Sequence, residues 1–198
     1  MSVEHNLRIA GLVLAGGQGT RLGVQDKGLV EVAGDTMISH VISRFSPQVE
    51  RLSISANRNQ EQYAQYGFDI ISDDTAEYLG PLAGICAGLR WCPADFLAVV
   101  PCDSPRLPDN LVASLADSIE KENSAIAMAS AGGYRQPVFA LIDKKLRSSL
   151  LSFLKNGERK IGKWYESHHA IEVEFDNLQA FANINTERDR AMLELEIR

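Results

Sequence analysis

The sequence is poor in cysteine and has no excess of positive charge. Only three cysteines occur among 198 residues. None forms a C-x-x-C pair, which argues against a disulfide framework or a cysteine metal site. We expect buried, reduced thiols at Cys86, Cys92 and Cys102, as in a reducing compartment. With 20 Lys and Arg against 26 Asp and Glu, the net charge is −6, so the basic stripe of a nucleic-acid-binding surface is absent.

Long apolar runs, linkers and repeats are also missing. The apolar stretch after Arg8 is short and ends in glycines, and Glu4 precedes any cation. Neither a signal peptide nor a membrane span is therefore expected. We predict a cytoplasmic protein in which residues 1–198 form a single domain, within the usual size of about 100–200 residues.

A histidine-based catalytic set is not evident. The histidines are scattered at His5, His40, His168 and His169. The adjacent pair precedes a predicted strand, in what we interpret as a solvated loop. Base catalysis by histidine is therefore not indicated.

Short apolar segments alternate with amphipathic ones, and this alternation is typical of an α/β fold with a parallel sheet and right-handed crossovers. Strands are predicted over residues 9–14, 52–56, 69–71, 96–100, 124–129, 136–142 and 170–175. Helices are predicted over 36–45, 59–66, 81–91, 108–121, 143–154 and 160–166 and from Glu187, with Thr186 as N-cap. Gly132 and Gly133 predict a turn, and 15–35 and 101–108 are left as loops, where function tends to lie.

The first predicted strand runs into a glycine-rich loop that carries Arg21 and is followed by Lys27. Backbone N–H groups at glycines can approach a phosphate closely, and the two cations can neutralise its charge. The same glycines could serve an ordinary strand-to-loop turn, and that alternative stays open. The two cations favour phosphate binding.

Two familiar phosphate loops do not fit this spacing. A Walker-type loop needs Gly-Lys followed by Ser or Thr, but Lys27 lies between Asp26 and Gly28. A dinucleotide-binding fingerprint needs G-x-G-x-x-G, whereas the glycines at 17, 19 and 23 are spaced G-x-G-x-x-x-G.

Ligands of open α/β sheets bind beyond the carboxyl ends of the strands. Asp103 follows such a strand between Pro101 and Pro105, which stiffen the backbone around its carboxylate. A rigid carboxylate suits Mg²⁺, which binds one or two protein carboxylates together with substrate phosphates. Asp103 could instead cap a turn, and Asp73 and Asp74 have the same two interpretations.

Small residues recur every four positions in the predicted helix 81–91, at Gly80, Gly84 and Gly88. One interpretation is close packing on the sheet, which we favour for Gly88. The other is that Gly80 and Gly84, at the helix start, let a base or phosphate lie against the backbone.

Five motifs in this order resemble the molybdenum cofactor guanylyltransferases, the MobA family. They are LAGGQGTRLG, DKG, GPLAG, PCDSP and NINT. The resemblance runs from about Ile9 to the last helix. It implies a Rossmann-like three-layer sandwich with a mostly parallel sheet, of the nucleotide-diphospho-sugar transferase type.

The resemblance also implies the reaction, in which GMP passes from GTP to molybdenum-bound molybdopterin, with Mg²⁺, and pyrophosphate is released. The implied partners are GTP, the molybdenum cofactor, cofactor-biosynthesis proteins and acceptor molybdoenzymes, with no nucleic acid or membrane. The implied catalytic residues are Arg21, Lys27 and Asp103, with Asp103 also the metal ligand. Nucleotide contacts are implied for Leu14, Ala15, Gly16, Gly17, Lys27, Ser55, Asp73, Gly80, Gly84 and Asp103, and the pterin side for Asn183 and Asn185.

The chain departs from the family at two positions. Ser55 stands where some relatives have asparagine, so its nucleotide contact depends on a hydroxyl. Val24 replaces a glycine. Two alternatives stay open: a cytidylyl- or sugar-phosphate nucleotidylyltransferase, and a noncatalytic nucleotide-binding module that delivers the cofactor.

Overall fold

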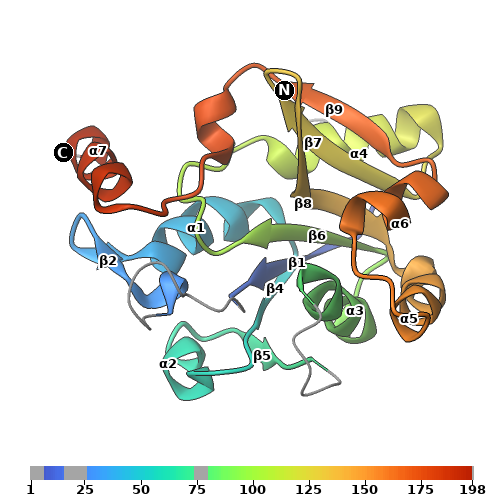
Figure 1. Cartoon of the computed structure of the whole chain (residues 1–198), viewed down its shortest axis with the longest axis horizontal. Helices are drawn as coiled ribbons and strands as arrows, with labels where there is room; N and C mark the ends of the chain where they lie inside the picture. Colours follow the sequence, from blue (N-terminus) through green and yellow to red (C-terminus); the bar gives the residue numbers. More distant parts are fainter. Residues whose placement is uncertain (1–6, 16–25, 74–79, 198) are drawn as a thin grey trace.

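The computed structural model describes residues 7–15, 26–73 and 80–197, and these ranges contain a seven-stranded sheet (Figure 1). The spatial order of its strands is β5-β4-β1-β6-β8-β7-β9. The bounds are β1 Ile9–Leu14, β4 Arg51–Ser55, β5 Asp69–Ile71, β6 Phe96–Pro101, β7 Ile126–Ala131, β8 Tyr134–Asp143 and β9 Ile171–Phe175.

The first four strands of this order are parallel, and β8 reverses the direction. Strand β1 pairs in parallel with both neighbours, so that Val13 lies opposite Ile54 of β4 and Val100 of β6. Strand β8 is antiparallel to β6 and β7, and β9 is parallel to β7. The β7–β8 turn uses Gly132 and Gly133, whose φ angles of 57° and 77° favour glycine. The predicted mostly parallel sheet and this turn are confirmed.

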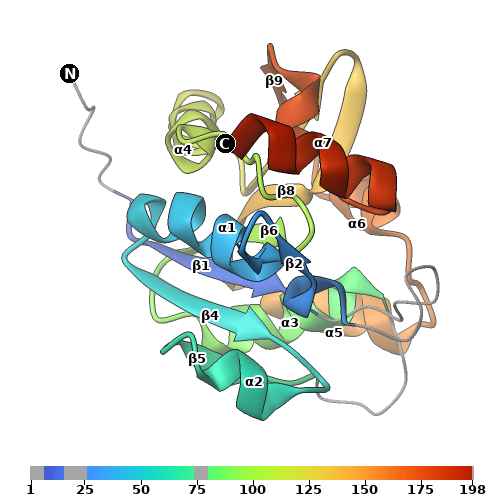
Figure 2. The same ribbon diagram turned by 90° about the vertical axis from the view of Figure 1, so that its left-hand side faces the viewer.

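Helices cover both faces of the sheet and make three layers (Figures 1 and 2). Helices α1 Met37–Phe45 and α4 Leu111–Glu122 pack on one face, where Phe45, Ile54 and Leu115 share a core. On the other face lie α3 Pro81–Trp91, α5 Arg147–Lys155 and α6 Ile161–Ser167, with Leu12 and Trp164 in the second core. The short α2, Gln60–Ala64, joins β4 to β5. None of the helices in the described ranges is long and apolar enough to cross a membrane.

Helix α3 lies very close to the sheet at its glycines. A Cβ added to Gly88 would come within 2.5 Å of Leu12 Cδ2 and 2.9 Å of Leu97 Cδ2, distances that real Cβ atoms do not show. The packing interpretation of Gly88 is confirmed. The predicted bounds of α3 and β5 match the structure.

The predicted loop 15–35 was wrong in its second half, because a small hairpin forms there. It comprises η1 Lys27–Leu29, β2 Glu31–Val32 and β3 Asp35–Thr36. After the 3₁₀ turn η4, Leu178–Phe181, the chain crosses to this hairpin, and α7 Glu187–Ile197 lies beside it (Figure 2). Leu193 and Ile184 pack with Val32 in a third apolar cluster. The remaining 3₁₀ turns are η2 Ser46–Gln48 and η3 Lys144–Leu146.

The three cysteines are buried and free of disulfides, as predicted. The His168-His169 pair lies in the turn before β9, as expected, with His169 exposed and His168 half-buried. His168 caps the end of α6, and its Nε2 lies 2.6 Å from Ser149 Oγ, partly buried.

Candidate functional site

Backbone hydrogen bonds between neighbouring parallel strands continue for one residue beyond the carboxyl ends of β1, β4 and β6. The backbone N–H of Cys102 donates to the carbonyl of Leu14 (3.1 Å), and that of Ala15 donates to the carbonyl of Ser55 (2.9 Å). Ala56 donates in the same way to Ile71 (2.9 Å). The residues that follow these strands therefore share one edge of the sheet, where ligands of such folds bind.

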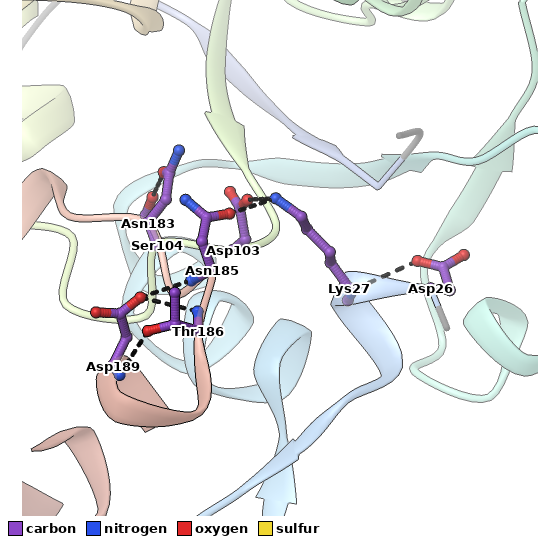
Figure 3. A network of polar contacts seen from close by, with 9 residues as sticks. Asp26, Lys27, Asp103, Ser104, Asn183, Asn185, Thr186 and Asp189 are labelled. Carbon is purple, nitrogen blue, oxygen red and sulfur yellow. Dashed lines mark hydrogen bonds and ion pairs between the residues drawn. The ribbon is translucent and has the colours of Figure 1, made fainter. Parts of the chain in front are cut away.

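Three predicted site residues meet at this edge (Figure 3). The Lys27 ammonium lies 3.1 Å from Asp103 Oδ2 and donates to Asn185 Oδ1 at 2.5 Å. The side chains of Lys27 and Asp103 are 30% and 12% exposed, so water screens this ion pair less than one on the open surface. The Lys27 ammonium and the Asp103 carboxylate thus lie side by side. The amide of Asn185 connects this pair to the C-terminal segment.

The C-terminal segment is pinned to the Asp103 loop. Asp103 accepts the N–H of Ile184 at its backbone carbonyl (2.9 Å), and the Ser104 hydroxyl donates to Asn183 Oδ1 (2.7 Å). Further along, Asp189 Oδ2 accepts the N–H groups of Asn185 and Thr186 (Figure 3). The hydrogen bonds from Thr186 and the backbone lower the pKa of Asp189, so its carboxylate stays charged and holds this turn.

Asn183 and Asn185 do not belong to a helix or a strand. They lie in the irregular segment between η4 and α7. Thr186 accepts the N–H of Asp189 at 3.2 Å, which agrees with its predicted role as N-cap.

Asp73 follows β5 at the same edge and pairs with Asn57, which follows β4. Asn57 Nδ2 donates to Asp73 Oδ2 (2.8 Å), and the Asp73 N–H donates to Asn57 Oδ1 (2.9 Å). Asp73 Oδ1 is buried and has no hydrogen-bond partner among the described residues. Burial raises the pKa of Asp73, and the bond from Asn57 partly opposes this. A buried polar atom without a partner is uncommon and indicates a place for a ligand donor.

The two glycines at the start of α3, Gly80 and Gly84, differ in how closely other residues approach them. Gly80 has a φ of 72°, and a Cβ added there would meet nothing within 4 Å. At Gly84 an added Cβ would lie 2.8 Å from both Leu14 Cδ2 and Ser55 Oγ. Gly84 therefore packs closely against β1 and β4, whereas no described residue lies near the position that a Gly80 side chain would take. Ala15 is buried at the end of β1.

Gly16, Gly17 and Arg21 of the glycine-rich loop lie outside the described residues. The expected meeting of Gly17 and Asp103 at one ligand stays a prediction for that reason.

Sequence reasoning missed Asp26, Asn59 and Tyr63 as parts of this region. The Asp26 carboxylate accepts hydrogen bonds from Tyr63 Oη (2.5 Å) and Asn59 Nδ2 (3.1 Å). Asp26 stood in the quoted DKG motif, but nothing in the residue pattern linked it to the helix at 59–66.

The thiol beside the site is not suited to be a nucleophile. Cys102 is buried, and burial, followed by the neighbouring Asp103 charge, raises its pKa well above the ordinary value. It therefore stays protonated at neutral pH.

No three His, Cys, Asp or Glu side chains within the described residues are grouped so that they could hold a metal by themselves. A groove of about 940 Å³ lies elsewhere, between α1, α4 and α7, and its lining includes Arg44, Arg106 and Asp109 but not Lys27 or Asp103.

Comparison with known proteins identifies relatives over nearly the whole chain. A family model described as the MobA-like NTP transferase domain matches residues 11–171. The molybdenum cofactor guanylyltransferase of Shewanella baltica (strain OS185) is 47% identical over 191 residues, which cover 96% of this chain and 97% of that protein. A protein of the same name from Shewanella amazonensis is 49% identical over 182 residues, covering 91% and 93%.

A solved structure agrees with these sequence matches. The crystal structure of molybdopterin-guanine dinucleotide biosynthesis protein A from Archaeoglobus fulgidus superposes with a TM-score of 0.80 at 25% identity, covering 95% of this chain and 98% of that one. The predicted three-layer α/β fold is confirmed by this match.

Proposed function

Because the chain belongs to the MobA-like NTP transferase family, we propose that it is a molybdenum cofactor guanylyltransferase. It transfers GMP from GTP to molybdenum-bound molybdopterin and releases pyrophosphate. The observation that carries this proposal is the meeting of Lys27 with Asp103 at the carboxyl edge of the sheet, in a chain 47% identical to enzymes of that name.

The reaction needs little from the protein beyond alignment and charge neutralisation. A phosphate monoester loses its second proton near about pH 6, so the terminal phosphate of the pterin is already a nucleophile at neutral pH. One of its oxygens attacks the α-phosphorus of GTP, and the bond from that phosphorus to the β-phosphate bridging oxygen breaks. Pyrophosphate leaves with the bond electrons. Lys27 neutralises charge on the phosphates during this exchange.

We assign Mg²⁺ to Asp103. A single carboxylate at the site fits an ion that completes its shell with substrate phosphates and water, and it does not require a group of three protein ligands. When bound, Mg²⁺ would withdraw charge from the phosphate oxygens. Asp103 is rigid enough for this because its carbonyl is fixed by the Ile184 N–H.

The remaining roles follow the edge of the sheet. Asp73 would accept a hydrogen bond from the nucleoside at its unpartnered Oδ1. The space beside Gly80, which none of the described residues fills, would take the nucleotide. Asn183 and Asn185 would face the pterin. Leu14, Ala15, Ser55 and Gly84, with Gly16, Gly17 and Arg21, remain the proposed lining of the nucleotide site. The three free, buried thiols support a cytoplasmic location.

The decisive test is to incubate the purified protein with molybdenum-bound molybdopterin, Mg²⁺ and each of GTP, CTP, UTP and ATP in turn. We expect pyrophosphate and the guanine dinucleotide, identified by mass spectrometry, with GTP alone. Turnover of CTP or UTP instead would favour the cytidylyl or sugar-phosphate alternative.

Asp103→Ala separates an enzyme from a binding module. The variant should still bind nucleotide but lose turnover by roughly 100-fold or more, as when one stabilising group is removed from a charged transition state. Normal product formation by Asp103→Ala, or folded wild type that binds GTP and forms no product, would contradict the proposal.

A further inference from the structure

We propose that Tyr63 and Asn59 are positioning residues for Lys27: together they fix the Asp26 carboxylate, and with it the turn from which Lys27 reaches the phosphate site. This inference rests on the proposed function, because it assumes that Lys27 binds the phosphates of GTP. It assigns a role to three residues that lie outside the site predicted from the sequence.

Three donors among the described residues hold the Asp26 carboxylate. Its Oδ1 accepts hydrogen bonds from Tyr63 Oη at 2.5 Å and from the Gly28 N–H at 3.3 Å. Its Oδ2 accepts one from Asn59 Nδ2 at 3.1 Å. Two of these donors come from the α2 region, and one comes from the turn that contains Lys27. The carboxylate therefore ties that turn to α2.

Tyr63 is well suited to be the anchor of this contact. Its side chain is fully buried, and burial raises its pKa far above the ordinary value, so the hydroxyl keeps its proton and donates. A hydrogen bond to a charged acceptor is stronger than one between neutral groups. The tyrosine hydroxyl therefore remains a donor to Asp26 at neutral pH.

Glycine at position 28 permits the close approach. A Cβ added to Gly28 would lie 2.6 Å from Tyr63 Oη, closer than real Cβ atoms come to other atoms. The DKG motif therefore has a packing reason for its glycine: any side chain there would push the Tyr63 hydroxyl away from Asp26.

The two α2 donors are themselves rigidly spaced. Asn59 has a left-handed backbone with φ of 53°, and its carbonyl accepts the N–H of Tyr63 at 3.1 Å. Asn59 and Tyr63 therefore belong to one helical turn and present their donors to Asp26 together.

The position of Lys27 depends on the hydrogen bonds from Tyr63 and Asn59 to Asp26. Lys27 opens the 3₁₀ turn η1, and Asp26 is the N-cap of that turn. The Leu29 N–H closes the turn by donating to the Asp26 carbonyl at 3.0 Å. Lysine has a long, flexible side chain, so holding its backbone reduces the entropy lost when the ammonium binds phosphate. Without these hydrogen bonds, the Lys27 ammonium must be ordered when it binds the phosphate.

Tyr66 provides a matched control. It lies three residues after Tyr63, and its hydroxyl contacts Thr36 Oγ1 at 2.6 Å, at the N-cap of α1. Tyr66→Phe therefore removes one tyrosine hydroxyl from the same part of the chain without touching Asp26.

The experiment compares binding of GTP and of guanosine by calorimetry in wild type and in Tyr63→Phe, Tyr66→Phe, Lys27→Met and the Tyr63→Phe/Lys27→Met double variant. We expect Tyr63→Phe to weaken GTP binding about tenfold, the typical effect of losing a hydrogen bond to a charged group, with guanosine binding unchanged. Tyr66→Phe should bind both ligands as wild type does. The double variant should bind GTP no more weakly than Lys27→Met alone, because the tyrosine acts through the lysine.

Asn59→Gly is a second variant, since glycine tolerates the left-handed backbone and removes only the amide. It should weaken GTP binding in the same direction and by less, because this hydrogen bond is exposed.

Each other outcome has a definite meaning. Equal GTP binding by Tyr63→Phe and wild type, with Lys27→Met impaired, overturns the positioning role alone. Equal loss of guanosine and GTP binding also overturns it, because that pattern reports general damage. The positioning role is also overturned if the losses of GTP binding in the two single variants add up in the double variant. Unimpaired GTP binding by Lys27→Met refutes the role of Lys27 in the proposed function, and the inference falls with it.

Discussion

Replacing Asp73 with asparagine is expected to stabilise the protein while weakening its hold on GTP. In the structure one carboxylate oxygen of Asp73 accepts a hydrogen bond from Asn57, and the other is buried without a partner in the part of the chain that the structure describes. Asparagine keeps an oxygen for Asn57 and exchanges the unpartnered charged atom for a neutral amide nitrogen. A neutral group costs less to bury than a charged one.

The gain comes only from removing the charge, because the amide nitrogen of asparagine would lack a partner just as the oxygen does. A buried neutral group without a hydrogen bond costs about 1–3 kcal/mol, and a charged one costs more. Asp73 is only partly buried, and water screens its charge, so we expect a difference of about 1 kcal/mol at neutral pH.

The gain should depend on pH with a definite sign. Burial raises the pKa of Asp73 above its ordinary value of 3.8, so the folded protein takes up the proton more readily than the unfolded chain. The wild type therefore loses free energy of unfolding as pH rises from about 3.8 through the raised pKa, and the loss is constant above it. Below about pH 3.8 the variant should have no advantage from this cause.

Urea unfolding of both proteins across this pH range measures the stability, and calorimetric titration with GTP measures the binding. We expect GTP binding to weaken about tenfold, because the oxygen that we propose to face the nucleoside becomes a donor. A variant less stable than wild type at neutral pH, or one equally stable that binds GTP normally, would show that the unpartnered oxygen is not kept for a ligand.

Three further results are expected. Gly88→Ala should lower the free energy of unfolding by about 1–3 kcal/mol in denaturant titrations, because the added methyl overlaps Leu12, and an unchanged midpoint would refute the close packing. Lys27→Met should reduce turnover by roughly 100-fold while the circular dichroism spectrum stays native, and wild-type turnover would contradict its role at the phosphates. Burial lowers the pKa of His168, which contacts Ser149. The free energy of unfolding of the wild type should therefore fall as pH drops from about 6.5 through the lowered pKa, and that of His168→Gln should fall less. Parallel pH profiles of the two proteins would refute this.

Local patterns were sufficient to predict the elements that build the sheet. Helix α3 begins at Pro81, a residue preferred in the first turn, and its apolar run is long enough to show helical periodicity. The hairpin of β2 and β3 was missed because two-residue strands show no alternation, and its order comes from packing against Leu193, more than 150 residues away.

In the candidate site, too, some features could be predicted from local sequence patterns and others could not. The chemistry of Lys27 and Asp103 was predictable, because both follow buried strands or glycines at the ligand-binding edge. The contact between Lys27 and Asn185 was not, since it joins residues 158 positions apart through the path of the C-terminal segment. Tyr63 likewise fits the apolar face of a short helix, and only the fold shows that its hydroxyl meets Asp26.

The bond between Lys27 and Asn185 has a consequence for how the protein is made. Asn185 is translated 82 residues after Asp103, an interval of roughly 4–16 seconds at about 5–20 residues per second. During that time the emerging polypeptide contains the lysine and the carboxylate but lacks the amide that accepts the hydrogen bond from Lys27. The contact among Lys27, Asp103 and Asn185 can therefore form only after the C-terminal segment has been synthesised.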